Sequence, residues 1–220
     1  MNKTVNGVVC AGILTLAAAS VDAALLSRLG GMAVYDTDLD ITWLADANAA
    51  AGTIFDDGFS NSDGRLTWNN ALAWADSLTI GGFNDWRLPL TPDPDSTCIG
   101  NATSLGAEGF NCTGSELGHL FYDELGGTAF VDILDSTDPD LAMFSNIQAA
   151  YWSGTEIASD TSLAWGMSYK VGLQAGTSKV NTSFAWAVRD GDVGTVSEPS
   201  MLALLGIGLI GFMTYGRNRS

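Results

Sequence analysis

Two short apolar segments, one near each end of the chain, confine the folded part to the residues between them. At the N-terminal end, a basic residue precedes an apolar run over residues 8–19, and Val21-Asp22-Ala23 follows with small residues at the cleavage-determining positions. This pattern is typical of a secretory signal peptide. We therefore predict a leader over residues 1–23, cleaved after Ala23, and export through the Sec translocon.

The C-terminal segment has three parts. A short polar motif over residues 196–200 leads into an apolar run over residues 201–215, and a basic end over residues 216–220 closes the chain. An α-helix rises about 1.5 Å per residue, so this run is shorter than the ~30 Å hydrocarbon core of a bilayer. We expect a single transmembrane helix that anchors the chain transiently, with the basic end in the cytoplasm and the domain outside.

This tail resembles the PEP-CTERM sorting signal, with Glu198 and Pro199 matching its motif and Ser197 standing in place of its first proline. The resemblance implies recognition by an exosortase, in a Gram-negative bacterium that also makes exopolysaccharide. It also implies a location at the cell surface, in the outer envelope or outside the cell, after transient anchoring in the inner membrane. A plain membrane anchor is the alternative, and the sequence leaves open whether the tail is cleaved.

The segment between, residues 24–195, is strongly acidic. It holds six of the nine basic residues and 23 of the 25 acidic residues. The negative electrostatic potential of such a domain repels nucleic acid and anionic lipid, which we exclude as partners of the domain, and it attracts cations. The same charge keeps an exported protein soluble. Apolar residues make up 46% of the chain, with seven Trp, so this segment is predicted to fold rather than to be disordered.

Two cysteines, Cys98 and Cys112, lie in this segment. An even number of cysteines in an exported chain predicts a disulfide, here across a loop rich in Gly and Asn. Closing a loop of about 15 residues stabilises a fold by roughly 3 kcal/mol in the chain-entropy model.

Hydrophobic periodicity predicts an α+β domain with two helices followed by antiparallel strands with one buried face. One helix begins after the cap Thr67 and ends at Gly81-Gly82, with an apolar stripe at Trp68, Ala71, Leu72, Ala75 and Leu78. The other begins near Thr113 or Ser115 and ends at Gly126-Gly127, with a stripe at Leu117, Leu120, Phe121 and Leu125. The predicted strands span residues 33–35, 41–44, 151–155, 163–171 and 184–188, with a turn over residues 172–176.

Five segments in this order resemble the Lcl C-terminal-type domain: Leu39-Asp40-Ile41-Thr42-Trp43-Leu44, Leu66-Thr67-Trp68-Asn69-Asn70-Ala71, Gly82-Phe83-Asn84-Asp85-Trp86-Arg87-Leu88-Pro89, Tyr151-Trp152-Ser153-Gly154-Thr155 and Ala185-Trp186-Ala187-Val188-Arg189. The resemblance implies a fold related to C-type lectin and formylglycine-generating-enzyme domains. It also implies adhesion or glycan binding, the roles proposed for some members.

Catalytic signals are weak in this sequence. The one histidine, His119, lies between stripe residues of the second predicted helix and is interpreted as a partly exposed helix residue rather than a base. We therefore predict that the protein is not an enzyme. Asp36, Asp38 and Asp40 alternate in one turn and offer hard oxygen ligands for a structural calcium ion, and we predict no other cofactor. Solvated turn acids are the alternative interpretation.

Tryptophan faces stack on sugars in exported binding modules, but Trp43, Trp68, Trp86, Trp152 and Trp186 fall at periodic or motif positions and are predicted to be core. Three functions stay open. The domain is a non-catalytic module that binds exopolysaccharide or a surface glycan, a purely structural matrix protein without a small ligand, or a carboxylate-dependent hydrolase.

Overall fold

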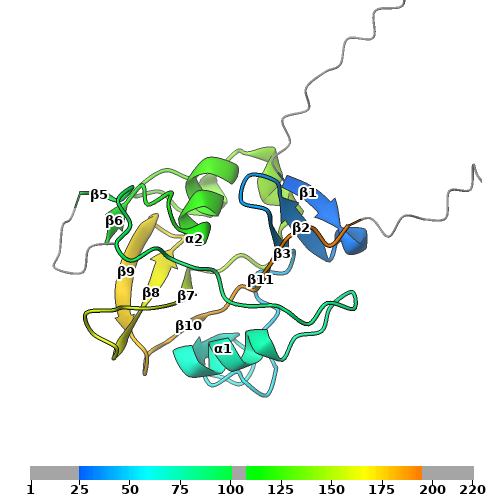
Figure 1. Ribbon diagram of the computed structural model, residues 1–220, viewed down its shortest axis with the longest axis horizontal. Coiled ribbons are helices and arrows are strands. Elements are labelled where there is room, and N and C mark those ends of the chain that lie inside the picture. Colours follow the sequence, from blue (N-terminus) through cyan, green and yellow to red (C-terminus); the bar gives the residue numbers. More distant parts are fainter. Residues whose placement is uncertain (1–24, 101–107, 195–220) are drawn as a thin grey trace, which may run out of the picture.

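A small antiparallel sheet joins the two ends of the folded domain. The computed structural model describes residues 25–100 and 108–194. In that part, the sheet has the strand order β1-β2-β3-β11 (Figure 1). Its strands are β1 (Leu25–Arg28), β2 (Ala33–Asp36), β3 (Ile41–Leu44) and β11 (Val188–Asp190). Because β11 is the last strand in the chain and pairs with β3, the sheet is complete only when both ends of the domain meet.

A larger sheet carries the rest of the domain, in the order β4-β10-β7-β8-β9-β6-β5. All of its neighbouring strands are antiparallel except β7 and β10, which pair in parallel. Its strands are β4 (Arg65–Thr67), β5 (Ile99–Gly100), β6 (Gly109–Phe110), β7 (Ala150–Glu156), β8 (Leu163–Ser168), β9 (Leu173–Ser178) and β10 (Thr182–Phe184). The predicted α+β class with mostly antiparallel strands is confirmed.

The turn predicted over residues 172–176 is wrong for most of its length. Gly172 ends the turn, with a φ of 71° and its N–H bonded to the carbonyl of Ser168. The next residues form β9, where Gly176 pairs with Trp165 across the sheet. Glycine serves there as a small neighbour for a large ring, not as a turn residue.

The first helix, α1 (Trp68–Asp76), begins after Thr67 as predicted but ends before the two glycines. The Ser77 hydroxyl donates to the carbonyl of Trp74 at the C-terminus of α1, and the chain then leaves the helix. Of the predicted stripe, Trp68, Ala71 and Ala75 are buried. Trp74 is also buried and was missing from the prediction.

The second helix is short and changes its pitch. Helix α2 (Glu116–His119) begins after Ser115, whose hydroxyl oxygen accepts from the N–H of Gly118 at 3.0 Å. It continues as a π-helical turn over Leu120–Glu124. The four predicted stripe residues are all buried. Short 3₁₀ turns complete the description at Leu29–Gly31, Ile133–Asp135 and Pro139–Met143.

Aromatic side chains from both sheets build the core. The Trp186 ring lies 5.3 Å from Trp43, 5.1 Å from Phe144 and 5.0 Å from Tyr151, measured between ring centroids. Buried Trp also needs a hydrogen-bond partner, and Trp186 donates to the carbonyl of Leu44 at 2.7 Å. This ring therefore ties the small sheet to the large one.

The segments that carry the family resemblance meet in space. The N–H of Arg87 donates to the carbonyl of Val188, and the Gly154 N–H and Ser153 hydroxyl both donate to the carbonyl of Pro89. The Trp-Arg-Leu-Pro segment thus crosses between β7 and β11. These motifs therefore hold the two sheets together.

The predicted ends of the chain fall outside the described residues. These comprise the leader over residues 1–23 with its cleavage site at Ala23, and the sorting tail over residues 196–220 with Glu198, Pro199 and the transmembrane helix predicted over residues 201–215. Among the residues that the structure describes, no helix has the length and apolar character needed to cross a membrane.

Candidate functional site

All seven tryptophans are buried. Each exposes 8% of its area or less, so the prediction that Trp43, Trp68, Trp86, Trp152 and Trp186 belong to the core is confirmed. A ligand cannot stack on rings that solvent does not reach. Stacking of a ligand on this domain would therefore need Phe or Tyr residues.

One outward groove, with a volume of about 560 Å³, does present such residues. Phe59 projects from the loop before β4 and is 88% exposed. The Arg65 guanidinium carbon lies 5.4 Å from the Phe59 ring centroid and 4.9 Å from that of Phe184. Arg65 is thus held between two aromatic faces. Asn181, Thr182 and Ser183 add amide and hydroxyl groups to the same groove.

The loop that carries Phe59 is shaped by one aspartate. The Asp63 carboxylate accepts from the N–H groups of Phe59, Ser60 and Arg65 at 3.0 to 3.3 Å. Burial alone would raise the pKa of Asp63, but these backbone hydrogen bonds lower it overall. The loop is therefore a defined platform for the Phe59 ring. One sequence feature indicated this loop: a lone aromatic residue, Phe59, lies in a polar segment.

The three aspartates considered for calcium make separate contacts. Asp36 is fully buried, and its Oδ1 accepts from the N–H groups of Asp38 and Leu39. Asp40 accepts from the hydroxyl of Tyr35, and Asp38 is exposed. The three carboxylates do not form one ligand group among the described residues. Calcium binding at this turn stays a prediction.

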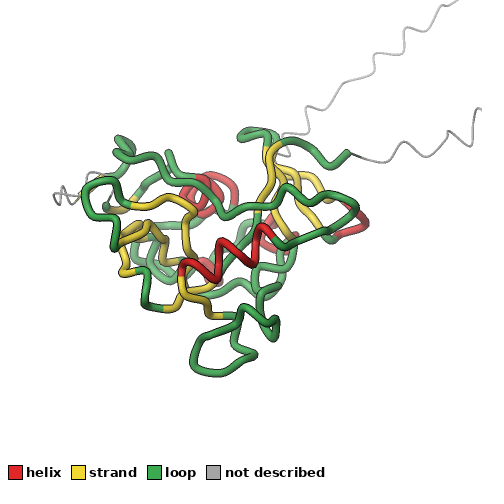
Figure 2. Tube along the Cα trace, turned by 60° about the horizontal axis from the view of Figure 1, so that its bottom comes forward, coloured by secondary structure: helices red, strands yellow, loops and turns green. Residues whose placement is uncertain are grey.

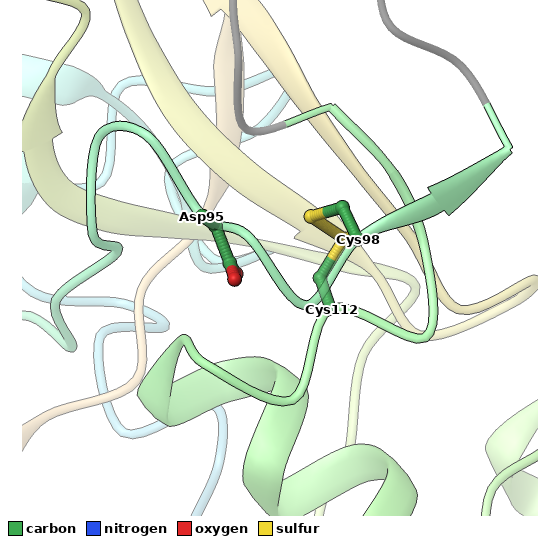
Figure 3. A group of neighbouring side chains, drawn as sticks. All are labelled: Asp95, Cys98 and Cys112. Atoms are coloured by element: carbon green, nitrogen blue, oxygen red, sulfur yellow. A yellow bond between two sulfur atoms is a disulfide. The ribbon is translucent and has the colours of Figure 1, made fainter.

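The predicted disulfide is present. Cys98 and Cys112 are joined across a loop with a sequence separation of 14, between the segment before β5 and the one before α2 (Figure 3). Asp95 lies beside the disulfide, and both of its carboxylate oxygens accept hydrogen bonds, Oδ1 from Thr97 and Oδ2 from Gln174. Because oxidised sulfur is not a thiolate, this group is a structural cross-link and not a metal site.

His119 is a partly exposed helix residue, as predicted, with 13% of its side chain exposed. Its Nε2 lies 3.0 Å from Glu124 Oε1 and 3.8 Å from Asp36 Oδ2, and its Nδ1 lies 3.2 Å from Asp123 Oδ2. The hydrogen bond with Glu124, together with the other carboxylates, raises the pKa of His119 despite burial. Burial raises the pKa of Asp36. Sequence reasoning did not predict this cluster.

Comparison with known proteins identifies both parts of the chain. Residues 195–219 match the PEP-CTERM protein-sorting motif, which implies an exported, surface-associated protein processed by an exosortase. No curated protein and no solved structure is significantly similar to this chain. Residues 32–189, well over half of the 220 residues, match the Lcl C-terminal domain. The chain therefore belongs to the Lcl C-terminal domain family.

Proposed function

We propose that this protein is a cell-surface or extracellular-matrix protein whose domain binds polysaccharide without catalysis. One observation carries the proposal: the groove in which Arg65 lies between the rings of Phe59 and Phe184. Phe59 is 88% exposed in a protein that buries all seven Trp, and Val180, which lines the same groove, is 82% exposed. Neighbouring exposed apolar side chains rimmed by polar groups are typical of an interaction site.

The chemistry of the groove suits a sugar chain. An aromatic face packs against the apolar C–H face of a pyranose ring, while amide, hydroxyl and guanidinium groups fix the orientation of the sugar hydroxyls. Asn181, Thr182 and Ser183 supply such groups next to the Phe59–Arg65 stack. The expected relation to C-type lectin and formylglycine-generating-enzyme domains supports the same class of ligand.

The position of the groove also suits a tethered protein. Both described ends of the chain lie together, because Arg28 in β1 pairs with Asp192 at 2.7 Å. The turn between β9 and β10, which lines the groove, lies at the opposite end of the domain from β1 (Figures 1 and 2). A domain held by its C-terminal tail would thus present the groove outward.

A hydrolase is the less favoured function. It needs two carboxylates that reach the substrate. Asp36 and Glu124 do come close together, but Asp36 is fully buried and cannot touch a polysaccharide. Non-catalytic binding is therefore the proposal that the groove supports.

The test is binding of the exported protein to the host's exopolysaccharide, to neutral glucans and to polyuronates, by pull-down and calorimetry. We expect saturable binding to at least one of them, weakened about tenfold or more by Phe59→Ala, by analogy with the stacking of nucleic-acid bases on aromatic side chains, which contributes about 1–3 kcal/mol. Phe130→Ala is the matched control, because Phe130 is 73% exposed and does not line this groove.

Two results would contradict the proposal. Equal loss of binding in the Phe59 and Phe130 variants would show that the groove is not the site. Absence of saturable binding to any polysaccharide, together with concentration-dependent self-association, would instead favour the purely structural matrix protein.

A further inference from the structure

A cluster of ionisable side chains joins α2 to the small sheet and is independent of the groove. Its members come from two distant parts of the chain: Asp36 ends β2, His119 ends α2, and Glu124 ends the π-helical turn. Nε2 of His119 and one carboxylate oxygen each of Asp36 and Glu124 all lie within 4.8 Å of one another.

The π-helical turn creates this convergence. His119 and Glu124 are five residues apart, and in an α-helix of 3.6 residues per turn they would lie about 140° apart around the axis. Here the N–H of Leu125 bonds to the carbonyl of Leu120, five residues back, and the wider turn brings Glu124 within 3.0 Å of His119. Single π-helical turns occur frequently at functional sites because they redirect side chains in this way.

One buried carboxylate oxygen in the cluster has no hydrogen bond among the described residues. Asp36 is fully buried, and although its Oδ1 accepts two backbone N–H groups, its Oδ2 has no hydrogen bond within the described part of the chain. That oxygen faces Nε2 of His119 at 3.8 Å. A buried carboxylate oxygen without a partner costs stability, so its retention in this position calls for a cation.

We propose that Asp36, His119 and Glu124 bind a divalent transition-metal ion, best matched by zinc. Zinc bonds to imidazole nitrogen and carboxylate oxygen are about 2.1 Å long, so two ligands of a tetrahedral zinc ion lie about 3.4 Å apart, and the two distances from Nε2 fall on either side of this spacing. The distances from Nε2 to Glu124 and to Asp36 are 3.0 and 3.8 Å. A mixed nitrogen and oxygen ligand set favours a transition metal over calcium.

Charge balance supports a divalent ion. Asp36 and Glu124 bring two negative charges into a region where their side chains expose 0% and 4% of their area. A protonated imidazole balances one of these charges, whereas a divalent ion bound to neutral imidazole balances both. Asp140 lies close enough that Glu124 helps to raise its pKa, after burial and Asp138, so the surrounding field also attracts a cation.

Asp123 acts as a positioning residue. Its Oδ2 lies 3.2 Å from Nδ1 of His119, on the side of the ring away from the cluster. A carboxylate at Nδ1 keeps the proton there and leaves the Nε2 lone pair free, the arrangement found behind many metal-bound histidines. Asp123 is 48% exposed and so can make this contact without being buried.

The test uses the exported protein, purified without a histidine tag and stripped with a chelator. Titration calorimetry with zinc, manganese and calcium ions should show about one zinc ion per chain, bound at least tenfold more tightly than calcium. Asp36→Asn, Glu124→Gln and His119→Gln should each weaken zinc binding about tenfold or more. Asp160→Asn, an exposed acid outside the cluster, should leave it unchanged.

A second measurement needs no variant of the ligands. The chain has a single histidine, so its imidazole ¹⁵N signals report on this site alone. Zinc should shift the Nε2 signal, and Asp123→Asn should weaken zinc binding about tenfold and alter the tautomer signals. No zinc binding by calorimetry, unchanged ¹⁵N signals on zinc addition, or a zinc affinity in the three ligand variants equal to that of the unmodified protein would each overturn the proposal.

Discussion

Arg87 and His119 both connect α2 to the small sheet, but they balance charge in opposite ways. Arg87 donates two hydrogen bonds of 2.8 Å to Glu116 on α2 and also bonds Asp190 in β11. Burial lowers the pKa of Arg87, but these two carboxylates raise it to a value above that of a free guanidinium. His119 instead faces several carboxylates with one imidazole, and Asp36 Oδ2 has no hydrogen bond.

The difference separates a structural contact from a binding site. In the Arg87 contact a bidentate guanidinium satisfies both oxygens of Glu116, and the N–H of Leu90 adds a further bond. No further ligand is needed there. In the His119 cluster one imidazole faces three carboxylates and Asp36 Oδ2 has no hydrogen bond, so the proposed divalent ion would complete the contact.

Removing the guanidinium should have the largest effect. We expect Arg87→Ala to lower the free energy of unfolding by about 3 kcal/mol, because it strands Glu116, whose side chain is only 17% exposed. Arg87→Lys should recover part of this loss, since lysine keeps the charge but not the bidentate geometry. Urea unfolding followed by tryptophan fluorescence measures both. A decrease in the free energy of unfolding below about 1 kcal/mol would contradict the expectation that the Arg87 contact stabilises the protein more than the His119 cluster does.

Loss of the disulfide should have the second largest effect on stability. The carbonyl of Cys112 accepts from the Ser115 hydroxyl at the start of α2, so the cross-link holds the N-terminal end of the helix that carries His119. Replacing both Cys98 and Cys112 by Ser should cost about 2–3 kcal/mol, as expected for a loop with a sequence separation of 14. Reduction of the unmodified protein should reproduce the loss. Coincident urea curves for the oxidised and the double-serine proteins would contradict it.

Much of the fold was predictable because its signals are local. Residues 41–44 form a short strand-like segment after an acidic turn, and Ser115 precedes an apolar stripe, so β3 and the start of α2 were predicted correctly. The end of α1 was not, because Ser77 closes the helix before the glycines. The position of Trp74 in the core was missed because the helix stripe was assigned from smaller residues.

The two candidate sites were less predictable, for physical reasons. His119 and Glu124 belong to different faces of any α-helix, and only the π-helical turn brings them together. Asp36 comes from a strand more than 80 positions earlier, and no local pattern connects it to His119. Phe59 was visible in a polar loop, but its stacking with Arg65 depends on how that loop folds around Asp63.

Neutralising one acid of the cluster should raise the free energy of unfolding, whereas the loss of Arg87 should lower it. In the metal-free protein at neutral pH, Asp36→Asn should raise the free energy of unfolding by about 1 kcal/mol. The asparagine oxygen keeps the bonds from Asp38 and Leu39, while a buried uncompensated charge is removed. Asp38→Asn, an exposed neighbour in the same turn, should change nothing. Destabilisation by Asp36→Asn without metal would mean that the imidazole alone balances Asp36.

The smallest effect should come from the ion pair that fastens the two described ends, Arg28 and Asp192. Its Nε–Oδ1 distance is 2.7 Å, but the Asp192 side chain is 34% exposed, so solvent reduces its contribution to about 0.5 kcal/mol or less. The hydrogen bond from Arg28 lowers the pKa of Asp192. A carboxyl whose pKa is lower in the folded state stabilises the fold above its ordinary value of 3.8, and that stability is lost as the pH falls through the lowered pKa. Asp192→Asn should therefore lower the melting temperature slightly at pH 7 and not at pH 2. Asparagine can keep the bond from the Gly194 N–H, so an equal decrease at both pH values would show that Asp192 acts through packing rather than through its charge.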